Sequence, residues 1–243
     1  HCYLTTVSID AHTTVEEIAY LAGHRAMLLL ENSYYEWPAY KRMIDAYSSD
    51  PVYGNMFKML RTAKDRELIT GEHLGGCGQL KSALKSLERN IGGRNLAMAK
   101  TCTLLDRDSD SPADFSEKQH SNIEHLSGKP VANITHADIY DLHQPNHRWH
   151  MWYWRMVENY FPDRVYKDLG YDMSRIPPTP ERHWSKISDC FKGTSKAFNK
   201  PDVGKLGATM ARTDYESGLQ HFTIEGKDMS ELQLFLLKLV KTI

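Results

Sequence analysis

The chain has 243 residues, which suits one elaborated domain or a domain with an appended lobe. Its 30 basic and 31 acidic residues give a formal net charge of −1, which excludes a global basic signature of nucleic-acid binding but not a local basic groove. The apolar fraction of 41% supports a real core, and no apolar run is long enough to span a membrane. The four cysteines are scattered, so we expect reduced cytosolic thiols and, without a recognisable signal peptide, a cytoplasmic protein.

The first half of the chain alternates strand-like and helix-like segments. Short apolar strands are predicted at residues 25–30, 67–74 and 101–105. Helices are predicted at residues 13–21, 36–46, 54–66 and 79–90. A glycine-rich turn at 75–78 separates the second strand from the last of these helices. This alternation predicts a mostly parallel sheet with helices on its faces, which is an α/β fold.

The second half of the chain predicts a mainly helical C-terminal lobe. Residues 109–127 are polar and indicate a loop or a partly disordered segment, whereas residues 130–134 are a candidate fourth strand. The aromatic-rich segment 151–161 is more typical of a core helix packed on the sheet than of a platform for stacking bases. Further helices are predicted at residues 184–198, 205–212 and 230–241. We therefore expect an N-terminal segment at 1–24, an α/β core at 25–150 and a lobe at 151–243.

Three histidines, His143, His147 and His150, have the spacing of one helix face. That spacing resembles a zinc site, but Pro145 would break the helix and no further ligand signature accompanies the histidines. A surface or aromatic-packing role is therefore favoured over a metal site.

Acidic residues follow the first and third predicted strands. Asp106, Asp108 and Asp110 come directly after the strand at 101–105, and Glu31 follows the strand at 25–30. Residues two apart in an extended segment point to the same side, and ligands bind at the carboxyl ends of the strands in open α/β sheets. Clustered carboxylates repel one another unless a cation lies between them, and hard oxygen ligands favour Mg²⁺ or Mn²⁺. The alternative is a solvated acidic loop that caps a following helix.

Several motifs of the chain resemble the TOPRIM domain of topoisomerases, primases and certain nucleases. They are Leu-Leu-Leu-Glu31, Leu-Gly75-Gly76 and Leu-Leu-Asp106-Arg-Asp108-Ser-Asp110, within residues 25–110. The chain is most similar to nucleases of the OLD (overcoming lysogenisation defect) type and their anti-phage relatives, including the TOPRIM effector of PARIS-type defence. The segment Arg155-Met-Val-Glu158-Asn159-Tyr160-Phe161 resembles the Glu-Asn-Tyr motif that follows the core in those proteins.

The resemblance implies a Mg²⁺- or Mn²⁺-dependent prokaryotic nuclease that cleaves DNA, RNA or tRNA. It implies the toxic effector of an anti-phage system, with an ABC- or AAA-type ATPase subunit as partner and a homodimer as a further candidate assembly. Glu158 would contribute to a second metal position, and Lys205 would face the metals. The candidate catalytic residues are Glu31, Asp106, Asp108 and Lys205. The candidate metal ligands are Glu31, Glu36, Asp106, Asp108, Asp110 and Glu158.

The chain departs from the family pattern at three positions. Asn32 replaces a usual glycine, Tyr35 stands where a second acid is usual with Glu36 one step later, and Met156 replaces another acid. Either Glu36 takes over through a shifted turn, or the first metal has one ligand fewer. One alternative is therefore a non-catalytic TOPRIM module that binds nucleic acid or a partner. Another is a phosphoryl-transfer enzyme of a different α/β family, which would leave Glu31 and Glu158 without a role.

Overall fold

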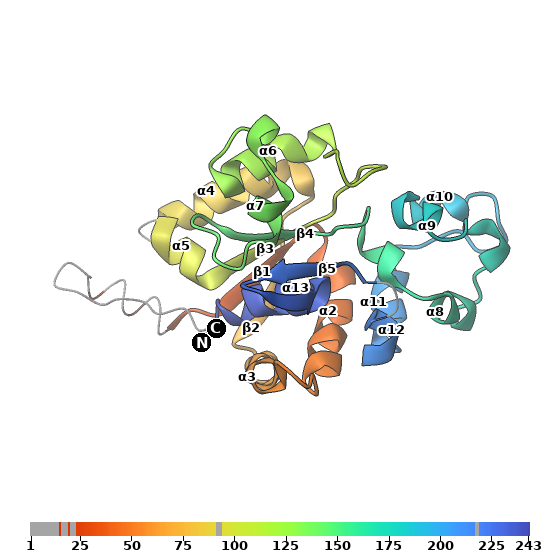
Figure 1. Ribbon diagram of the computed structural model, residues 1–243, viewed down its shortest axis with the longest axis horizontal. Coiled ribbons are helices and arrows are strands. Elements are labelled where there is room, and N and C mark those ends of the chain that lie inside the picture. The colour runs from red at the N-terminus through yellow and green to blue at the C-terminus, as the bar shows by residue number, and fades with distance from the viewer. Residues whose placement is uncertain (1–14, 16–18, 20–22, 91–93, 217–218) are drawn as a thin grey trace.

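A four-stranded parallel sheet forms the centre of the molecule (Figure 1). The computed structural model describes residues 15, 19, 23–90, 94–216 and 219–243. The strands, in the spatial order β2-β1-β3-β4, are β1 (Ala26–Leu30), β2 (Ile69–His73), β3 (Thr101–Leu105) and β4 (Arg148–Met151). Because every neighbouring pair is parallel, the carboxyl ends of all four strands meet at one edge of the sheet. The predicted α/β fold is confirmed.

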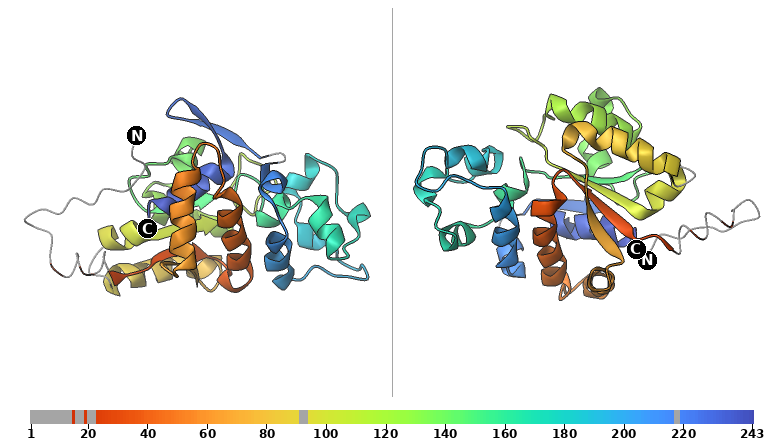
Figure 2. Two further views of the ribbon diagram at one scale, coloured as in Figure 1. Left: turned by 90° about the horizontal axis from the view of Figure 1, so that it is seen from below. Right: turned by 180° about the vertical axis from the view of Figure 1, so that it is seen from behind.

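Helices cover both faces of the sheet (Figures 1 and 2). One group of helices is α4 (Leu80–Asn90), α5 (Arg94–Lys100), α6 (Glu117–Ser127) and α7 (His136–Tyr140). The group on the other side is α2 (Ser33–Tyr47), α3 (Gly54–Asp65) and α13 (Glu231–Val240). The strands β1 and β3 between these layers are almost completely buried, as continuous apolar strands of a parallel sheet should be. Every helix in the described ranges is too short or too polar to traverse a lipid bilayer.

Most of the remaining elements follow β4 in the chain, and two short single-turn segments precede it. Four short single-turn segments are η1 (Cys77–Gln79), η2 (Val131–Asn133), η3 (Val157–Tyr160) and η4 (Met173–Arg175). The later helices are α8 (Asp163–Asp168), α9 (Glu181–Trp184), α10 (Ile187–Cys190), α11 (Pro201–Ala208) and α12 (Arg212–Glu216). An antiparallel hairpin of β5 (His221–Ile224) and β6 (Lys227–Ser230) leads into α13, whose leucines are buried in the same core as the sheet. Figure 2 shows α8, α9 and α10 projecting to one side of the sheet.

Two glycines let α11 pack closely against α2. An added Cβ at Gly207 would lie 2.5 Å from the Cβ of Ala39, and one at Gly204 would lie 3.0 Å from the carbonyl oxygen of Tyr35. Ordinary carbon–carbon contacts are about 3.5–4.0 Å long, so neither position has room for a side chain. This close approach fixes the start of α11 beside the start of α2, where the candidate site lies.

Several predicted elements differ from the structure. Residues 117–127 were predicted as part of a loop, but they form α6. The helix was not recognised because half of its buried positions are the amides Gln119 and Asn122, which leaves the apolar pattern incomplete. Residues 130–134 contain η2 instead of a strand, and the fourth strand is β4. The aromatic segment 151–161 holds the end of β4 and η3 instead of a core helix. Within the helix predicted at 184–198, only Trp184, the last residue of α9, and the four residues of α10 are helical. The hairpin β5–β6 was not predicted, and the helix predicted at 13–21 lies largely outside the described residues.

Candidate functional site

A cavity of about 410 Å³ lies at the carboxyl edge of the sheet, and carboxylates line it. They come from four segments of the chain: Glu31 follows β1, Glu36 lies in the first turn of α2, Asp106 and Asp108 follow β3, and Glu158 lies in η3. The prediction that Glu31 and Asp106 follow adjacent parallel strands is confirmed, since β1 pairs with β3 in parallel. The structure therefore brings together five of the six acids that the motifs suggested as metal ligands.

Glu31 is held by an amide that the sequence analysis did not identify. Gln119 of α6 is completely buried, and its Nε2 donates hydrogen bonds to Glu31 Oε1 at 2.7 Å and to the Asp106 carbonyl at 3.1 Å. Asn122, one turn later, donates from Nδ2 to Gln119 Oε1 at 2.9 Å, which fixes the orientation of the Gln119 amide. The buried Gln-x-x-Asn pair within a polar segment was the one available signal, and α6 was predicted as a loop.

The acidic loop after β3 is anchored by a buried arginine. Arg107 lies between Asp106 and Asp108 but is completely buried. Its guanidinium donates to the Tyr140 hydroxyl at 3.0 Å and to main-chain carbonyls of Pro112, Asp114, Trp152 and Tyr153. Arg107 points into the protein, and the side chains of Asp106 and Asp108 on either side of it line the cavity, as the Asp-x-Asp spacing predicted.

Asp108 adopts a strained backbone conformation within that loop. Its φ is +54°, in the left-handed region that non-glycine residues seldom occupy, and its amide donates to the Arg155 carbonyl at 3.0 Å. The surrounding contacts of Arg107 and Arg155 hold the loop in this shape, and such over-determined strain is typical of functional positions.

Glu158 is placed by its two neighbours in the Glu-Asn-Tyr segment. Asn159 donates to the Arg182 and Ser185 carbonyls, and the Tyr160 hydroxyl donates to Glu231 Oε2 at 2.6 Å. Burial raises the pKa of Glu231 to about 7, and the hydrogen bond from Tyr160 opposes this shift. Asn159 and Tyr160 therefore have structural roles: their hydrogen bonds fix the segment that places Glu158 in the lining of the cavity.

The carboxyl groups of the cavity are electrostatically unfavourable neighbours. Burial raises the pKa of Asp106 well above its ordinary value, and repulsion from Glu158 and Glu31 raises it further. The pKa of Glu36 is also raised well above its ordinary value, by burial and then by Glu158. Burial likewise raises the pKa values of Glu31 and Glu158, although the positive charge of Lys200 opposes both shifts. A bound cation would relieve these penalties.

A lysine at the start of α11 lines the cavity, and it is Lys200. Lys205, the residue that the motif resemblance suggested, is largely exposed, pairs with Asp202 at 3.0 Å and does not line the cavity. Four residues lie between the two lysines, and the motif resemblance indicated the lysine on the solvent side of α11. Lys200 acts electrostatically on Glu31, Glu36 and Glu158, whereas Lys205 is not among the groups that shift them.

Asp110 also lies outside the cavity. Its exposed carboxylate pairs with the guanidinium of Arg155 and lines an adjoining pocket together with Trp184. Lys186 lines both spaces and so connects them.

The three histidines of the predicted helix face are dispersed, because β4 replaces that helix. His143 is exposed and hydrogen-bonds Glu225 at 2.9 Å. His150 is buried against Glu231 and the rings of Tyr140 and Trp152, which matches the predicted aromatic-packing role. His147 is buried beside Glu88, a different acidic partner from those of His143 and His150.

Comparison of the chain with protein-family models, with curated proteins and with solved structures found no match. The TOPRIM resemblance therefore stays a prediction from motifs, and the function has to be inferred from the site itself.

Proposed function

We propose that the chain is a divalent-cation-dependent nuclease and that the carboxylate cavity is its active site. The observation that carries this proposal is the meeting of five carboxylates from four segments in one cavity at the carboxyl edge of a parallel sheet. Structural ion-pair networks balance such acids with basic partners, but among the described residues only two lysines, Lys186 and Lys200, and one histidine, His73, line this cavity beside the five acids. The uncompensated acids support cation binding.

The donor set fits Mg²⁺ or Mn²⁺, because all five side chains offer hard oxygen ligands. No three of them bring oxygen atoms within 4.8 Å of one another in the described part of the chain. Carboxylates spread around a cavity suit a pair of cations better than one fully chelated ion, since the ions of two-metal sites are about 3.5–4 Å apart. When bound, such cations polarise the phosphodiester, lower the pKa of an attacking water and stabilise the leaving oxygen.

The side chains of the cavity divide these tasks. Glu31, fixed by Gln119, and Asp106, whose Oδ1 accepts from the Val157 amide at 3.3 Å, are the most firmly placed carboxylates. Lys200 lies opposite them at the start of α11, where its ammonium offsets negative charge that develops on the phosphate. The adjoining pocket contains Lys186, Arg155 and the Trp184 ring, but Asp110, Glu181 and Asp189 also line it, so its lining is mixed in charge. We propose that Lys186 and the Trp184 ring contact the nucleic-acid strand there.

On the motif resemblance we further propose that the protein is an effector of prokaryotic anti-phage defence and that an ATPase subunit controls it. The test is cleavage of a panel of DNA, RNA and tRNA with Mg²⁺ or Mn²⁺, with chelator as the blank and with wild type beside Asp106→Asn. Asp228→Asn is the matched control, because Asp228 is an exposed hairpin residue that pairs with His221. Metal-dependent cleavage that only Asp106→Asn loses supports the proposal, whereas binding without cleavage would support a non-catalytic module.

A further inference from the structure

A second cluster of metal-ligating side chains lies apart from the carboxylate cavity. It consists of Glu88 of α4, His125 of α6 and His147, which directly precedes β4; we call it the Glu-His-His cluster. One carboxylate oxygen and two imidazole nitrogens of these residues all lie within 4.8 Å of one another. Of the residues that the structure describes, only these three form such a group.

The cluster and the cavity lie at opposite ends of the sheet. Arg148, the residue after His147, pairs with Cys102 near the start of β3, whereas Asp106 follows the end of that strand. The step of four positions from Cys102 to Asp106 spans about 13 Å at roughly 3.3 Å per residue. The Glu-His-His cluster therefore cannot share an ion with the carboxylates of the cavity.

Two of the distances in the cluster are close to those between the ligands of a small tetrahedral cation, and the shorter one is also a hydrogen bond between His147 and Glu88. The Nε2 atom of His147 lies 3.0 Å from Glu88 Oε1, and the Nε2 atom of His125 lies 3.8 Å from the same oxygen. Ligands bound to Zn²⁺ at about 2.0 Å in a tetrahedron are about 3.3 Å apart, a value between these two distances. Two imidazoles and one carboxylate are also an established ligand set for Zn²⁺ with an open fourth position.

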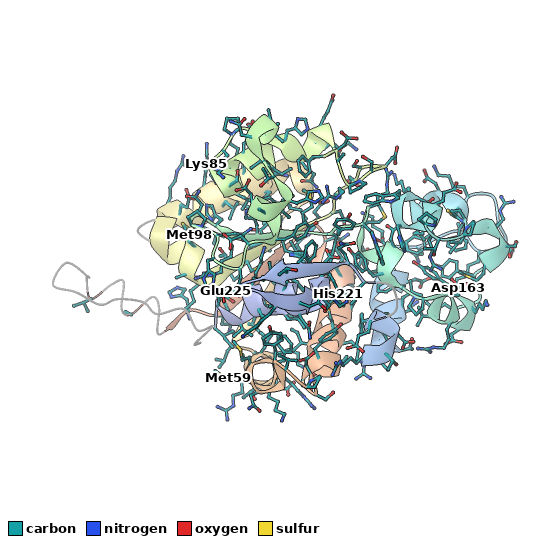
Figure 3. All side chains as sticks on the ribbon, in the orientation of Figure 1. Met59, Lys85, Met98, Asp163, His221 and Glu225 are labelled. Atoms are coloured by element: carbon teal, nitrogen blue, oxygen red, sulfur yellow. The ribbon has the colours of Figure 1, made fainter. Side chains whose placement is uncertain are left out.

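The burial of the three side chains suits a bound ion that can still be reached from solvent. The His147 side chain is completely buried, whereas Glu88 and His125 are 20% and 13% exposed. The rings of His125 and His147 lie with their centroids 5.4 Å apart, and the Nε2 atom of each approaches the Glu88 carboxylate. Figure 3 labels Lys85, which lies one turn before Glu88 on α4.

We propose that Glu88, His125 and His147 bind one transition-metal cation of the Zn²⁺ class, with a fourth coordination position open to solvent. The ion would join α4 and α6 to the entry of the edge strand β4, which are three segments distant in sequence. Because α6 also carries Gln119, the same helix links this site to the carboxylate that it orients, Glu31. The proposal does not depend on the nuclease activity, since it concerns separate residues with different ligand chemistry.

The test is Zn²⁺ binding by untagged, chelator-treated protein, measured by competition with a chromophoric chelator. The Asp106→Asn protein serves as the background, so that Zn²⁺ bound by the carboxylate cavity is reduced and can be recognised. We expect one tight Zn²⁺ per chain, a thermal midpoint that rises with Zn²⁺, and a visible absorption band typical of four-coordinate Co²⁺ when Co²⁺ replaces it. Millimolar Mg²⁺ should not displace the ion, because Mg²⁺ prefers oxygen ligands.

The variants Glu88→Gln and His125→Gln separate metal binding from folding. Both residues are partly exposed, so we expect folded proteins whose Zn²⁺ affinity is lower by at least tenfold and whose thermal midpoint no longer responds to Zn²⁺. His143→Gln is the matched control, because that exposed histidine pairs with Glu225, which Figure 3 labels on the hairpin, and should bind Zn²⁺ as the background does. Absence of a tight site in the background protein, or equal affinity in His125→Gln and the control, would overturn the proposal.

Discussion

The substitution Gly207→Ala should lower the cleavage rate, although Gly207 does not line the carboxylate cavity. The added Cβ would lie 2.5 Å from the Cβ of Ala39, whereas carbon atoms in contact are about 3.5–4.0 Å apart. Because Ala39 is buried in α2 and cannot rotate away, α11 must move outward by roughly 1 Å or more. That movement carries Lys200, which precedes α11, away from the acids that it faces.

Two measurements quantify the effect of Gly207→Ala. Overpacking of this kind costs about 1–3 kcal/mol, so denaturant titration should show a lower free energy of unfolding in a protein that still folds. A displacement of about 1 Å in a catalytic group can lower a rate by about 10²-fold, which a metal-dependent cleavage assay would detect. Gly23→Ala is the control, since no atom of the described residues, apart from its chain neighbours, lies within 4 Å of a Cβ added there. Unchanged stability and cleavage in Gly207→Ala would refute the tight packing of α11 against α2.

Three further predictions concern single side chains of the site. Lys200→Ala should reduce the cleavage rate by about 10²–10³-fold, whereas Lys205→Ala should stay near wild type; equal losses would show that the wrong lysine was assigned. Without divalent metal, Asp106→Asn should raise the free energy of unfolding at neutral pH. Because the pKa of Asp106 is raised in the folded state, the folded protein keeps this proton to higher pH than the unfolded chain does. The free energy of unfolding of the wild type therefore falls as the pH rises above the ordinary carboxyl range, and that of Asp106→Asn should fall less over the same pH titration. Arg107→Lys should destabilise the protein by about 3 kcal/mol or more, because a lysine cannot satisfy the same carbonyls and hydroxyl; a smaller loss on denaturant titration would contradict the anchoring role.

The central part of the fold could be predicted from sequence because its strands are short, apolar and bounded by clear turns. The segments at β1 and β3 are continuous apolar runs, and the acids after them follow from the shared carboxyl edge of a parallel sheet. The strand β4 was missed because its sequence Arg-Trp-His-Met lacks an apolar run. His150 of β4 has helical spacing with the preceding His143 and His147, and only the pairing with β3 reveals the strand.

The parts of the site that escaped prediction depend on contacts between distant segments. Gln119 is identified by its hydrogen bond to Glu31, 88 residues earlier, and the only local sign of its role is the Gln-x-x-Asn spacing within a polar segment. Lys200 was missed because its position depends on how α11 packs on α2, whereas the motif drew attention to Lys205. Likewise, the Glu-His-His cluster draws on three separated segments, so the spacing of His143, His147 and His150, which argued against a metal site, could not indicate it.

The most direct test of the account is metal-dependent cleavage by the purified protein, alone and with its proposed ATPase partner. The assay uses the panel of DNA, RNA and tRNA and compares wild type with Glu31→Gln, Asp106→Asn and Asp228→Asn. We predict cleavage of at least one substrate that requires Mg²⁺ or Mn²⁺, is abolished by the two cavity substitutions and is unaffected by Asp228→Asn. Cleavage that persists in Asp106→Asn, or that survives complete chelation of divalent metal, would contradict the assignment of the carboxylate cavity as the active site.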